Sequence, residues 1–225
     1  MIVRICASVV AKTMQELERM VNKANRDGAD FIEIRLDYLR SKYTLKEIRK
    51  LSSLPLIATN RSIVEGGSFE GSEDECFHIL YSAAESGFEF IDLELSTDSL
   101  ENKMKSLVDL GVETIVSSHF FTSPPFLRLN SIFKRELNTG ASICKIVAPA
   151  KSFEDNLIFL DFVKHASKTS KVVCFGMGEL GVTSRLFSPL VGGYLTYASV
   201  EKGKEAALGQ LTVSEMRRFY ELMEV

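Results

Sequence analysis

Residues 29–59 read ADFIEIRLDYLRSKYTLKEIRKLSSLPLIAT, and this stretch decides the fold. A run of strand length that is rich in apolar residues, 31–36, comes first, and a second run, 56–59, closes the stretch. Between them Thr44 precedes Glu47 by three residues, which is the spacing of a capping box at the start of a helix. The stretch therefore predicts a strand, a helix and a second strand, the repeating unit of a parallel sheet.

The same unit recurs along the whole chain. Most of its apolar runs are too continuously apolar for a sheet with one face in water, and several are rich in Val and Ile. The runs lie at residues 2–9, 31–36, 56–59, 88–93, 113–118, 142–148, 171–175 and 193–198. Between them, a capping side chain precedes an acid by three residues at Thr13/Glu16, Thr44/Glu47, Ser72/Glu75, Asp98/Glu101, Ser152/Asp155 and Thr212/Glu215.

Eight such units in 225 residues correspond to about 28 residues per unit. This number and length of units are typical of a (β/α)8 TIM barrel, an α/β fold with helices outside a closed parallel sheet. No linker or change of composition divides the chain, so we expect a single domain over residues 1–225. An open doubly wound sheet is built from the same units and is the alternative.

The composition is that of a globular protein, with 45% hydrophobic residues, 25% charged residues and a net charge of −3. The apolar fraction excludes a disordered chain, and the net charge creates no field that would attract nucleic acid or an acidic membrane. No run approaches the ~18–20 apolar residues of a membrane span, and the N-terminal run is read as a first strand rather than a secretion signal. The cysteines lack the spacing of a zinc site, so we expect no metal and four reduced thiols in a cytoplasmic protein: Cys6, Cys76, Cys144 and Cys174.

Charged and polar residues gather where the predicted strands end. In either fold, ligands bind at the carboxyl ends of the strands. An ion pair that closes the barrel explains any one of these residues, but several carboxylates and arginines from separate strands indicate a binding site. In chain order they are Glu33, Arg35, Asp37, Arg61, Glu65, Asp92, Glu94, His119, Lys145 and Arg185.

Lys145 is the most informative of these residues, because it shares a strand face with Ile143 and Val147 and is predicted in or near the barrel interior. A buried ammonium either pairs with a carboxylate or loses its proton. The structural interpretation is an ion pair with a glutamate inside the barrel. The functional interpretation is an amine that attacks a carbonyl. Lowering its pKa from about 10.4 to about 7–8 takes roughly 3–5 kcal/mol, which desolvation and neighbouring arginines could supply.

His119 is the natural proton carrier at this edge of the sheet, because the ordinary pKa of histidine lies near neutrality. A lone histidine at a strand end is more often structural, and a catalytic one needs an acid to orient it. Glu65, in the loop after the third predicted strand, could reach across the mouth of the barrel to do so.

Residues 176–181, GMGELG, match the G-x-G-x-x-G fingerprint of dinucleotide-binding proteins, and Glu201 follows about 20 residues on. The motif begins about 50 residues from the end of the chain, which leaves too little chain for a mononucleotide-binding half. We therefore expect no nucleotide cofactor. The glycines are expected to let a loop approach bound substrate closely.

Five short motifs in order along the chain resemble those of the type I 3-dehydroquinate dehydratases. They are EIRLD at 33–37, RSIVEGG at 61–67, SH at 118–119, KI at 145–146 and MGELGVTSR at 177–185. The resemblance implies a (β/α)8 barrel that dehydrates 3-dehydroquinate to 3-dehydroshikimate, the third step of the shikimate pathway. It further implies a homodimer that needs neither a metal nor an organic cofactor.

The resemblance also implies a catalytic set of three residues. Lys145 would form an imine, or Schiff base, with the C3 ketone; His119 would remove the C2 proton and later protonate the departing C1 hydroxyl; and Glu65 would hold the imidazole in the required tautomer. The implied substrate-binding residues are Glu33, Arg35 and Arg61 for the ring hydroxyls, Arg185 for the carboxylate, Phe175 and Met177 as apolar walls, Tyr197 near the end of the eighth strand, and Ala206 and Gln210 in a lid.

The predicted lid departs from the family pattern. Members usually read Ser-Ala-Pro-Gly-Gln, whereas residues 206–210 of this chain read AALGQ. Ala206 lacks a hydroxyl that would contact the substrate carboxylate, and Leu208 stands where a proline would stiffen the loop. One such hydrogen bond is worth about 0.5–1.5 kcal/mol, so we expect weaker substrate binding or a more mobile lid rather than a loss of chemistry.

Two other functions fit parts of the pattern. A class I aldolase is also a barrel with an imine-forming lysine, but it often binds a phosphate at the last two βα loops, whereas Arg185 suits a carboxylate better. A barrel that binds a related hydroxy acid as a sensor, without turnover, is suggested by the altered lid alone. A pure binding protein has no need of Lys145.

Overall fold

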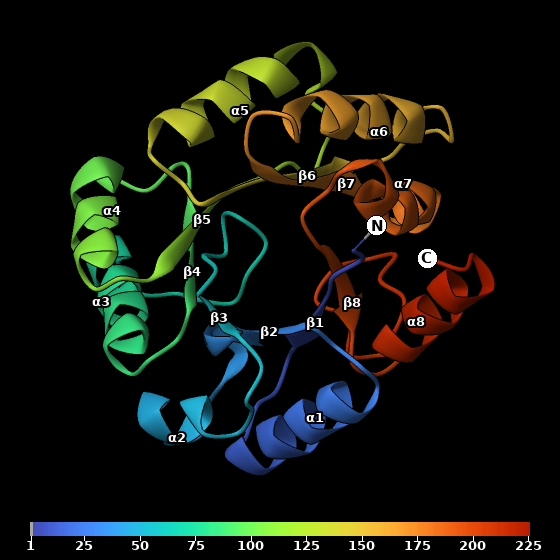
Figure 1. Ribbon diagram of the computed structural model, residues 1–225. Coiled ribbons are helices and arrows are strands. Elements are labelled where there is room, and N and C mark those ends of the chain that lie inside the picture. Colours follow the sequence, from blue (N-terminus) through green and yellow to red (C-terminus); the bar gives the residue numbers. More distant parts are fainter. Residues whose placement is uncertain (1) are drawn as a thin grey trace.

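Eight parallel strands form the wall of a barrel in the computed structural model, which describes residues 2–225 (Figure 1). They are β1 (Ile5–Val9), β2 (Phe31–Arg35), β3 (Leu56–Thr59), β4 (Phe90–Glu94), β5 (Glu113–His119), β6 (Ile143–Pro149), β7 (Lys171–Met177) and β8 (Thr196–Ser199). Their order is β7-β6-β5-β4-β3-β2-β1-β8, so that β1 pairs with both β2 and β8. No ladder joins β7 to β8 within residues 2–225, and Tyr194 N donates to Val172 O over 2.8 Å at this seam.

The predicted TIM barrel is therefore confirmed. The doubly wound alternative is wrong, because an open sheet does not bring the last strand beside the first in a sequential order. The predicted runs match the strands closely, but the first strand begins at Ile5 rather than at residue 2, and the eighth begins at Thr196 rather than at residue 193.

Helices alternate with the strands and cover the outside of the barrel (Figure 1). They are α1 (Met14–Arg26), α2 (Leu45–Arg49), α3 (Glu73–Glu85), α4 (Leu100–Asp109), α5 (Leu129–Asn138), α6 (Asp155–Ala166), α7 (Val182–Phe187) and α8 (Val213–Leu222). Four short 3-10 helices lie in the connections: η1 (Leu36–Tyr38), η2 (Phe126–Arg128), η3 (Glu179–Gly181) and η4 (Ser188–Val191).

Four of the six predicted helix starts are confirmed, with side chains that accept a hydrogen bond from the backbone of the acid three residues on: Thr13, Thr44, Ser72 and Thr212. The prediction at Asp98 is wrong by one residue, because α4 is preceded by Ser99 in the left-handed conformation, with φ 52° and no side-chain cap. At Ser152 the expected roles are reversed. The carboxylate of Asp155 accepts hydrogen bonds from the backbone of Lys151 and Ser152 over 2.7 and 3.1 Å.

The barrel interior is packed in layers. The layer nearer the amino ends of the strands is apolar and contains Cys6, Phe31, Ile57, Phe90, Ile115, Ile143, Val173 and Leu195. Side chains two residues further along a strand lie on the same face, so each of these residues is followed by one of the next layer. That layer is mostly polar: Ser8, Glu33, Thr59, Asp92, Ser117, Lys145, Phe175 and Tyr197. The change from apolar to polar places a charged floor at the carboxyl ends of the strands.

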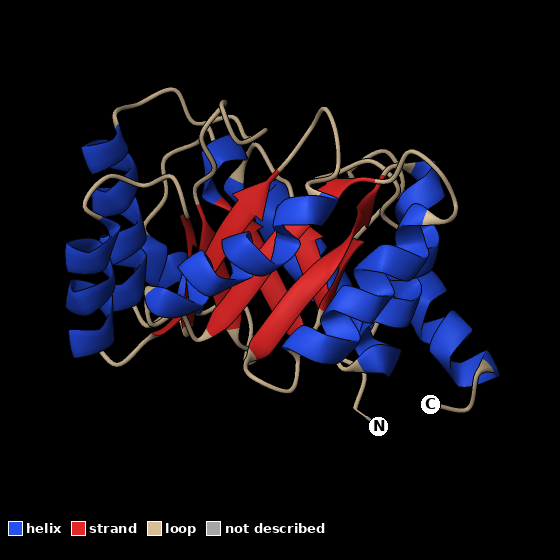
Figure 2. Cartoon of the chain, turned by 90° about the horizontal axis from the view of Figure 1, so that it is seen from above, coloured by secondary structure: helices blue, strands red, loops and turns tan. Residues whose placement is uncertain are grey.

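Figure 2 shows the barrel from the side, with strands inside and helices outside. Both chain termini lie at the end of the barrel away from the carboxyl ends of the strands (Figure 2). All four cysteines are free thiols, as expected, and only Cys76 is partly exposed. In the described part of the chain, no helix has the length and apolar character needed to cross a bilayer.

Candidate active site

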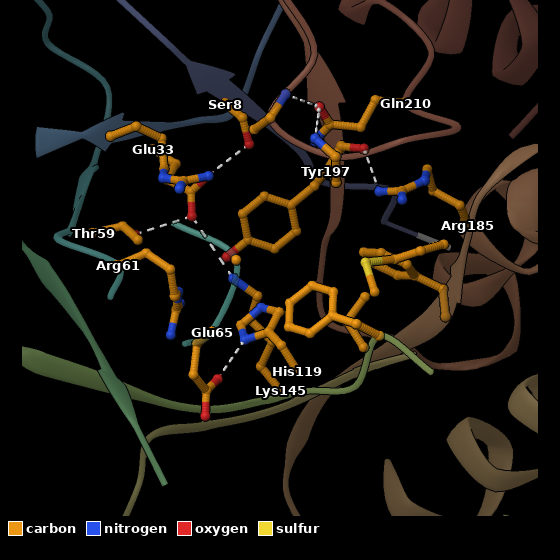
Figure 3. Close-up of a pocket in the computed structure, with 18 residues that line it drawn as sticks. Ser8, Glu33, Thr59, Arg61, Glu65, His119, Lys145, Arg185, Tyr197 and Gln210 are labelled. Carbon is orange, nitrogen blue, oxygen red and sulfur yellow. Dashed lines mark hydrogen bonds and ion pairs between the residues drawn. The ribbon is translucent and has the colours of Figure 1, made fainter. Parts of the chain in front are cut away.

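A pocket opens above the charged floor of the barrel (Figure 3). All twelve positions predicted as catalytic or substrate-binding line it: Glu33, Arg35, Arg61, Glu65, His119, Lys145, Phe175, Met177, Arg185, Tyr197, Ala206 and Gln210. Six further lining residues were not predicted as site residues: Ser8, Thr59, Gly66, Phe121, Val147 and Ala207. The residues come from strands and loops spread over the whole chain, which only the closed barrel brings together.

Lys145 lies at the centre of this pocket and is 5% exposed. Its Nζ donates a hydrogen bond to Asp92 Oδ2 over 2.9 Å, lies 3.7 Å from Glu33 Oε1 and sits 4.3 Å from the ring centre of Tyr197. The ion pair of the structural interpretation is therefore present, with an aspartate as the nearer partner. The expected burial is present too, but the charged groups in contact with Nζ are carboxylates rather than arginines.

Asp92 joins two cations beneath the pocket. Its Oδ1 accepts hydrogen bonds from Arg61 Nη2 over 2.7 Å and from Ser117 Oγ over 2.6 Å, while Oδ2 faces Lys145. Burial opposes ionisation of Asp92, but Arg61 and Lys145 outweigh it and hold the pKa of this carboxyl below its ordinary value. The sequence placed Asp92 at a strand end without a role. The available signal was its position two residues after Phe90, an acid in an otherwise buried strand face.

Glu33 and Arg35, both on β2, do not pair with each other. Glu33 accepts hydrogen bonds from Ser8 Oγ over 2.6 Å and from Thr59 Oγ1 over 3.0 Å, which fixes its carboxylate beside Lys145. Arg35 donates Nε and Nη2 to the two oxygens of Asp37 over 2.9 and 2.7 Å. This bidentate pair leaves Nη1 of Arg35 as the nitrogen free for a ligand.

His119 lies at the end of β5 and meets Glu65, as predicted, over 3.0 Å from Nδ1 to Oε2 (Figure 3). Ser96 Oγ holds the other carboxylate oxygen over 3.1 Å. A carboxylate accepts, so Nδ1 carries the proton and Nε2 keeps its lone pair. Burial, followed by the positive charges of Arg61 and Lys145, lowers the pKa of His119 well below 6.5. The imidazole is therefore neutral at neutral pH and can act as a base.

Arg185 is a buried cation without a counterion. It is 1% exposed, and Nη1 donates only to the backbone oxygen of Tyr197 over 3.3 Å. Its Nε and Nη2 atoms bond to nothing in residues 2–225, and its guanidinium carbon lies 4.3 Å from the ring centre of Phe175. Burial lowers the pKa of Arg185 to about 9. An unpaired buried guanidinium is costly, so this corner of the pocket is complementary to an anion.

The predicted lid, residues 206–210, lies over the pocket and is held at two points. Oε1 of Gln210 accepts hydrogen bonds from the backbone of Ala206 over 2.8 Å and of Ala207 over 3.3 Å. Gly178 N donates to Leu208 O over 3.0 Å and so ties the loop to the end of β7. The side chain of Gln210 therefore stabilises the conformation of its own loop.

The glycine motif at 176–181 serves backbone packing rather than the expected approach to substrate. A Cβ on Gly181 would lie 2.4 Å from the backbone of Gly176, so the turn after β7 closes only with glycine there. A Cβ on Gly209 of the lid would lie 2.2 Å from Gly178 O. The motif thus lets the lid lie directly on the turn that follows β7.

These groups together can bind an anion beside a buried amine and a neutral imidazole. The unpaired guanidinium belongs to Arg185, the amine to Lys145, and the imidazole to His119, whose Nδ1 contacts Glu65. Within residues 2–225, no group of three or more His, Cys, Asp and Glu side chains is arranged to hold a metal ion. The set suits attack on a carbonyl followed by proton transfer next to it.

Comparisons with known proteins identify the family. The model of the type I 3-dehydroquinase family matches residues 5–225. The chain is 34% identical to the 3-dehydroquinate dehydratase of Methanosarcina barkeri, over 97% of this chain and 95% of that protein, and 37% identical to that of Dehalococcoides mccartyi, over 86% of each. The crystal structure of 3-dehydroquinate dehydratase from Geobacillus kaustophilus matches with a TM-score of 0.91 at 25% identity, over 99% of this chain and 91% of that chain. The chain belongs to the type I 3-dehydroquinase family of hydro-lyase enzymes.

Proposed function

We propose that this protein dehydrates 3-dehydroquinate to 3-dehydroshikimate through an imine on Lys145, as a step of the shikimate pathway. The observation that carries the proposal is the unpaired guanidinium of Arg185 in the same pocket as Lys145 and the His119–Glu65 pair. The substrate has a carboxylate for Arg185, a ketone for Lys145 and an acidic C–H for His119. The names of the relatives support the same substrate.

Lys145 supplies the electron sink. Removal of a proton next to a ketone is difficult because the negative charge that develops must be delocalised. A protonated imine accepts that charge more readily than a ketone, so an amine bonded to C3 lowers the barrier at C2. The contacts of Nζ with Asp92 and Glu33 hold the amine in one position, and the carboxylates stabilise the positive charge of the imine after it forms.

His119 moves the protons. His119 lines the pocket and its Nε2 keeps a lone pair, so it can take the C2 proton. The same proton then goes to the C1 hydroxyl as the C–O bond breaks, which releases water and leaves the ring double bond. Glu65 fixes the tautomer through Nδ1 and stabilises the imidazolium between the two transfers.

The remaining polar groups orient the ring. Glu33, Arg35 and Arg61 are proposed to bind its hydroxyls, and Arg185 to grip its carboxylate through Nε and Nη2. Phe175, Met177 and Tyr197 form the less polar side of the pocket. Ala206 and Gln210 cover the substrate from the lid, where weaker binding is expected for want of a hydroxyl at position 206.

Turnover tests the proposal. The purified protein mixed with 3-dehydroquinate should form 3-dehydroshikimate, whose conjugated enone is followed by ultraviolet absorbance. Arg185→Met keeps the volume but removes the charge, and it should raise KM by about tenfold or more, because a charge-assisted hydrogen bond is worth about 1.5–3 kcal/mol. An unchanged KM would remove the carboxylate role of Arg185. Binding of 3-dehydroquinate without conversion would favour the sensor instead.

We further propose that residues 1–225 act as one catalytic domain, that the protein is a cytoplasmic homodimer, and that it uses neither a metal nor an organic cofactor. One pocket lined from β1 through the lid supports the single domain, and four free thiols suit a reducing compartment. Light scattering should give twice the chain mass of 25.1 kDa. Turnover should survive prolonged treatment with a chelator.

A further inference from the structure

Two residues of the pocket hold buried polar side-chain atoms that bond to nothing in residues 2–225. They are Arg185, through Nε and Nη2, and Tyr197, through its hydroxyl. Each of the other charged side chains that line the pocket has a partner: Glu33, Arg35, Arg61, Glu65, His119 and Lys145. The substrate carboxylate accounts for Arg185. No group in the proposed function accounts for the hydroxyl of Tyr197.

An unpartnered buried hydroxyl destabilises the ligand-free protein. Leaving such a group without a hydrogen bond costs about 1–3 kcal/mol, and phenylalanine would provide the same ring at this position without that cost. Tyr197 is 3% exposed and its hydroxyl oxygen is buried, so bulk water does not replace the missing hydrogen-bond partner. The hydroxyl is therefore held ready for a group that enters with the ligand.

The position of Tyr197 identifies that group. Tyr197 is on β8, level with Cys6 of β1, and its ring faces the end of the Lys145 side chain (Figure 3). The Nζ atom lies 4.3 Å from the ring centre, and Phe175 packs on the ring at 6.4 Å between centres. Any carbon that bonds to Nζ is thus placed beside the phenol ring, and an oxygen on that carbon is only two bonds from Nζ.

We propose that the Tyr197 hydroxyl is a catalytic hydrogen-bond donor to the oxygen on the carbon that Lys145 attacks. The inference rests on the proposed function, because it requires an imine at Lys145. In imine formation the ammonium and the ketone give a protonated imine and one water molecule. The C–N bond forms, the C–O bond breaks, one ammonium proton stays on nitrogen and the other two leave with the oxygen. Tyr197 keeps its own proton throughout.

The environment of the phenol suits a donor that does not ionise. Burial raises the pKa of Tyr197 well above 10, and the negative charges of Glu33 and Asp92 act in the same direction. The hydroxyl therefore remains protonated at neutral pH. By donating to the carbonyl oxygen it polarises the ketone before attack, and by donating to the same oxygen afterwards it helps water to leave.

The step can be measured by mixing the enzyme with 3-dehydroquinate, quenching with borohydride at increasing times and following the reduced adduct on Lys145 by mass. Tyr197→Phe removes only the hydroxyl and should slow adduct formation by about tenfold or more, with the same final extent. Tyr220→Phe is the matched control. Its hydroxyl is also buried, but it lies on α8 outside the pocket and donates to Leu186 O over 2.8 Å. Adduct formation at the wild-type rate is therefore expected.

The outcomes separate this inference from the proposed function. Adduct formation in Tyr197→Phe at the wild-type rate overturns the role of the hydroxyl and leaves the imine mechanism intact. Absence of any adduct in the wild-type enzyme overturns both. A slower rate in Tyr197→Phe and in Tyr220→Phe alike means that lost packing, rather than the donor, is responsible, and this also overturns the inference.

Discussion

The Nζ atom of Lys145 lies 2.9 Å from Oδ2 of Asp92, across the floor of the barrel from β6 to β4. The other oxygen of the same carboxylate is occupied by Arg61, so one buried anion holds two buried cations. A buried charge that is neither paired nor hydrogen-bonded is costly. Asp92 is therefore the residue on which the positions of Lys145 and Arg61 depend.

Asp92→Asn tests this dependence. The variant leaves Lys145 and Arg61 without their shared anion, and loss of one partner of a buried pair lowers the free energy of unfolding by about 3–5 kcal/mol. Urea denaturation measures the change. Asp109→Asn, at the exposed end of α4, is the control and should change the free energy of unfolding by no more than about 0.5 kcal/mol. Equal effects of the two substitutions would contradict the account.

The pH dependence of kcat/KM tests the state of His119. Burial and the charges of Arg61 and Lys145 lower the pKa of His119 well below 6.5, so the base stays neutral in mildly acidic solution. We expect kcat/KM at pH 6.0 to remain close to its value at pH 7.5. An unperturbed imidazole would lose about fourfold over this interval. A fall with a midpoint near pH 6.5 is the contradicting result.

Gly209→Ala tests the contact between the lid and the turn after β7. Gly209 has φ +77°, and a Cβ there would lie 2.2 Å from Gly178 O, so the lid cannot keep its contact with this turn. We expect KM to rise by about tenfold, because contacts at the substrate carboxylate end are lost. Gly203→Ala carries the same backbone strain, with φ +79° but no atom within 4 Å, and should keep KM. Steady-state kinetics of the two variants measure this difference, and equal KM values would show that the contact between the lid and the turn after β7 does not affect substrate binding.

Glu136 on α5 makes stability fall as the pH rises. Burial raises the pKa of Glu136 to about 9, and its Oε1 accepts a hydrogen bond from Ser118 Oγ over 2.7 Å. The unfolded chain releases this proton near pH 4.5 whereas the folded chain keeps it, so the stabilising contribution is complete below pH 4.5 and is lost progressively toward pH 9. Glu136→Gln keeps an acceptor for Ser118 and removes the titration.

The variant should therefore be more stable than the wild type at pH 7, by about 3 kcal/mol, and no more stable at pH 4. Urea denaturation at the two pH values measures the difference. Glu18→Gln, exposed on α1, should show no such pH dependence. A gain for Glu136→Gln that is equal at both pH values would show that burial of the acid is not its cause.

Much of this fold follows from local rules. Apolar runs and capping residues predicted the eight strands and four of the eight α-helix starts, because period-two burial and capping depend on near neighbours alone. Asp98 and Ser152 are not the capping residues, because α4 begins after Ser99 and α6 begins after Glu154, and neither of these neighbours provides a side-chain cap. Spacing along the chain does not decide between such neighbours.

The pocket could be predicted only in part. All twelve proposed site positions line it, since parallel strands end at one edge. The partners of these residues depend on how far each strand is shifted along its neighbour, and that shift is a property of the closed barrel. The sequence therefore missed Asp92 as the partner of Lys145, and it placed the glycines of 176–181 at the substrate instead of beneath the lid.

Borohydride reduction in the presence of 3-dehydroquinate, followed by peptide mass mapping, tests the central claim most directly. We expect an irreversible adduct on Lys145 and none in Lys145→Ala. His119→Ala should still form the adduct while its turnover falls far below that of the wild type, because the imine precedes proton removal. Turnover without any adduct, or an adduct on a lysine other than Lys145, would contradict the account.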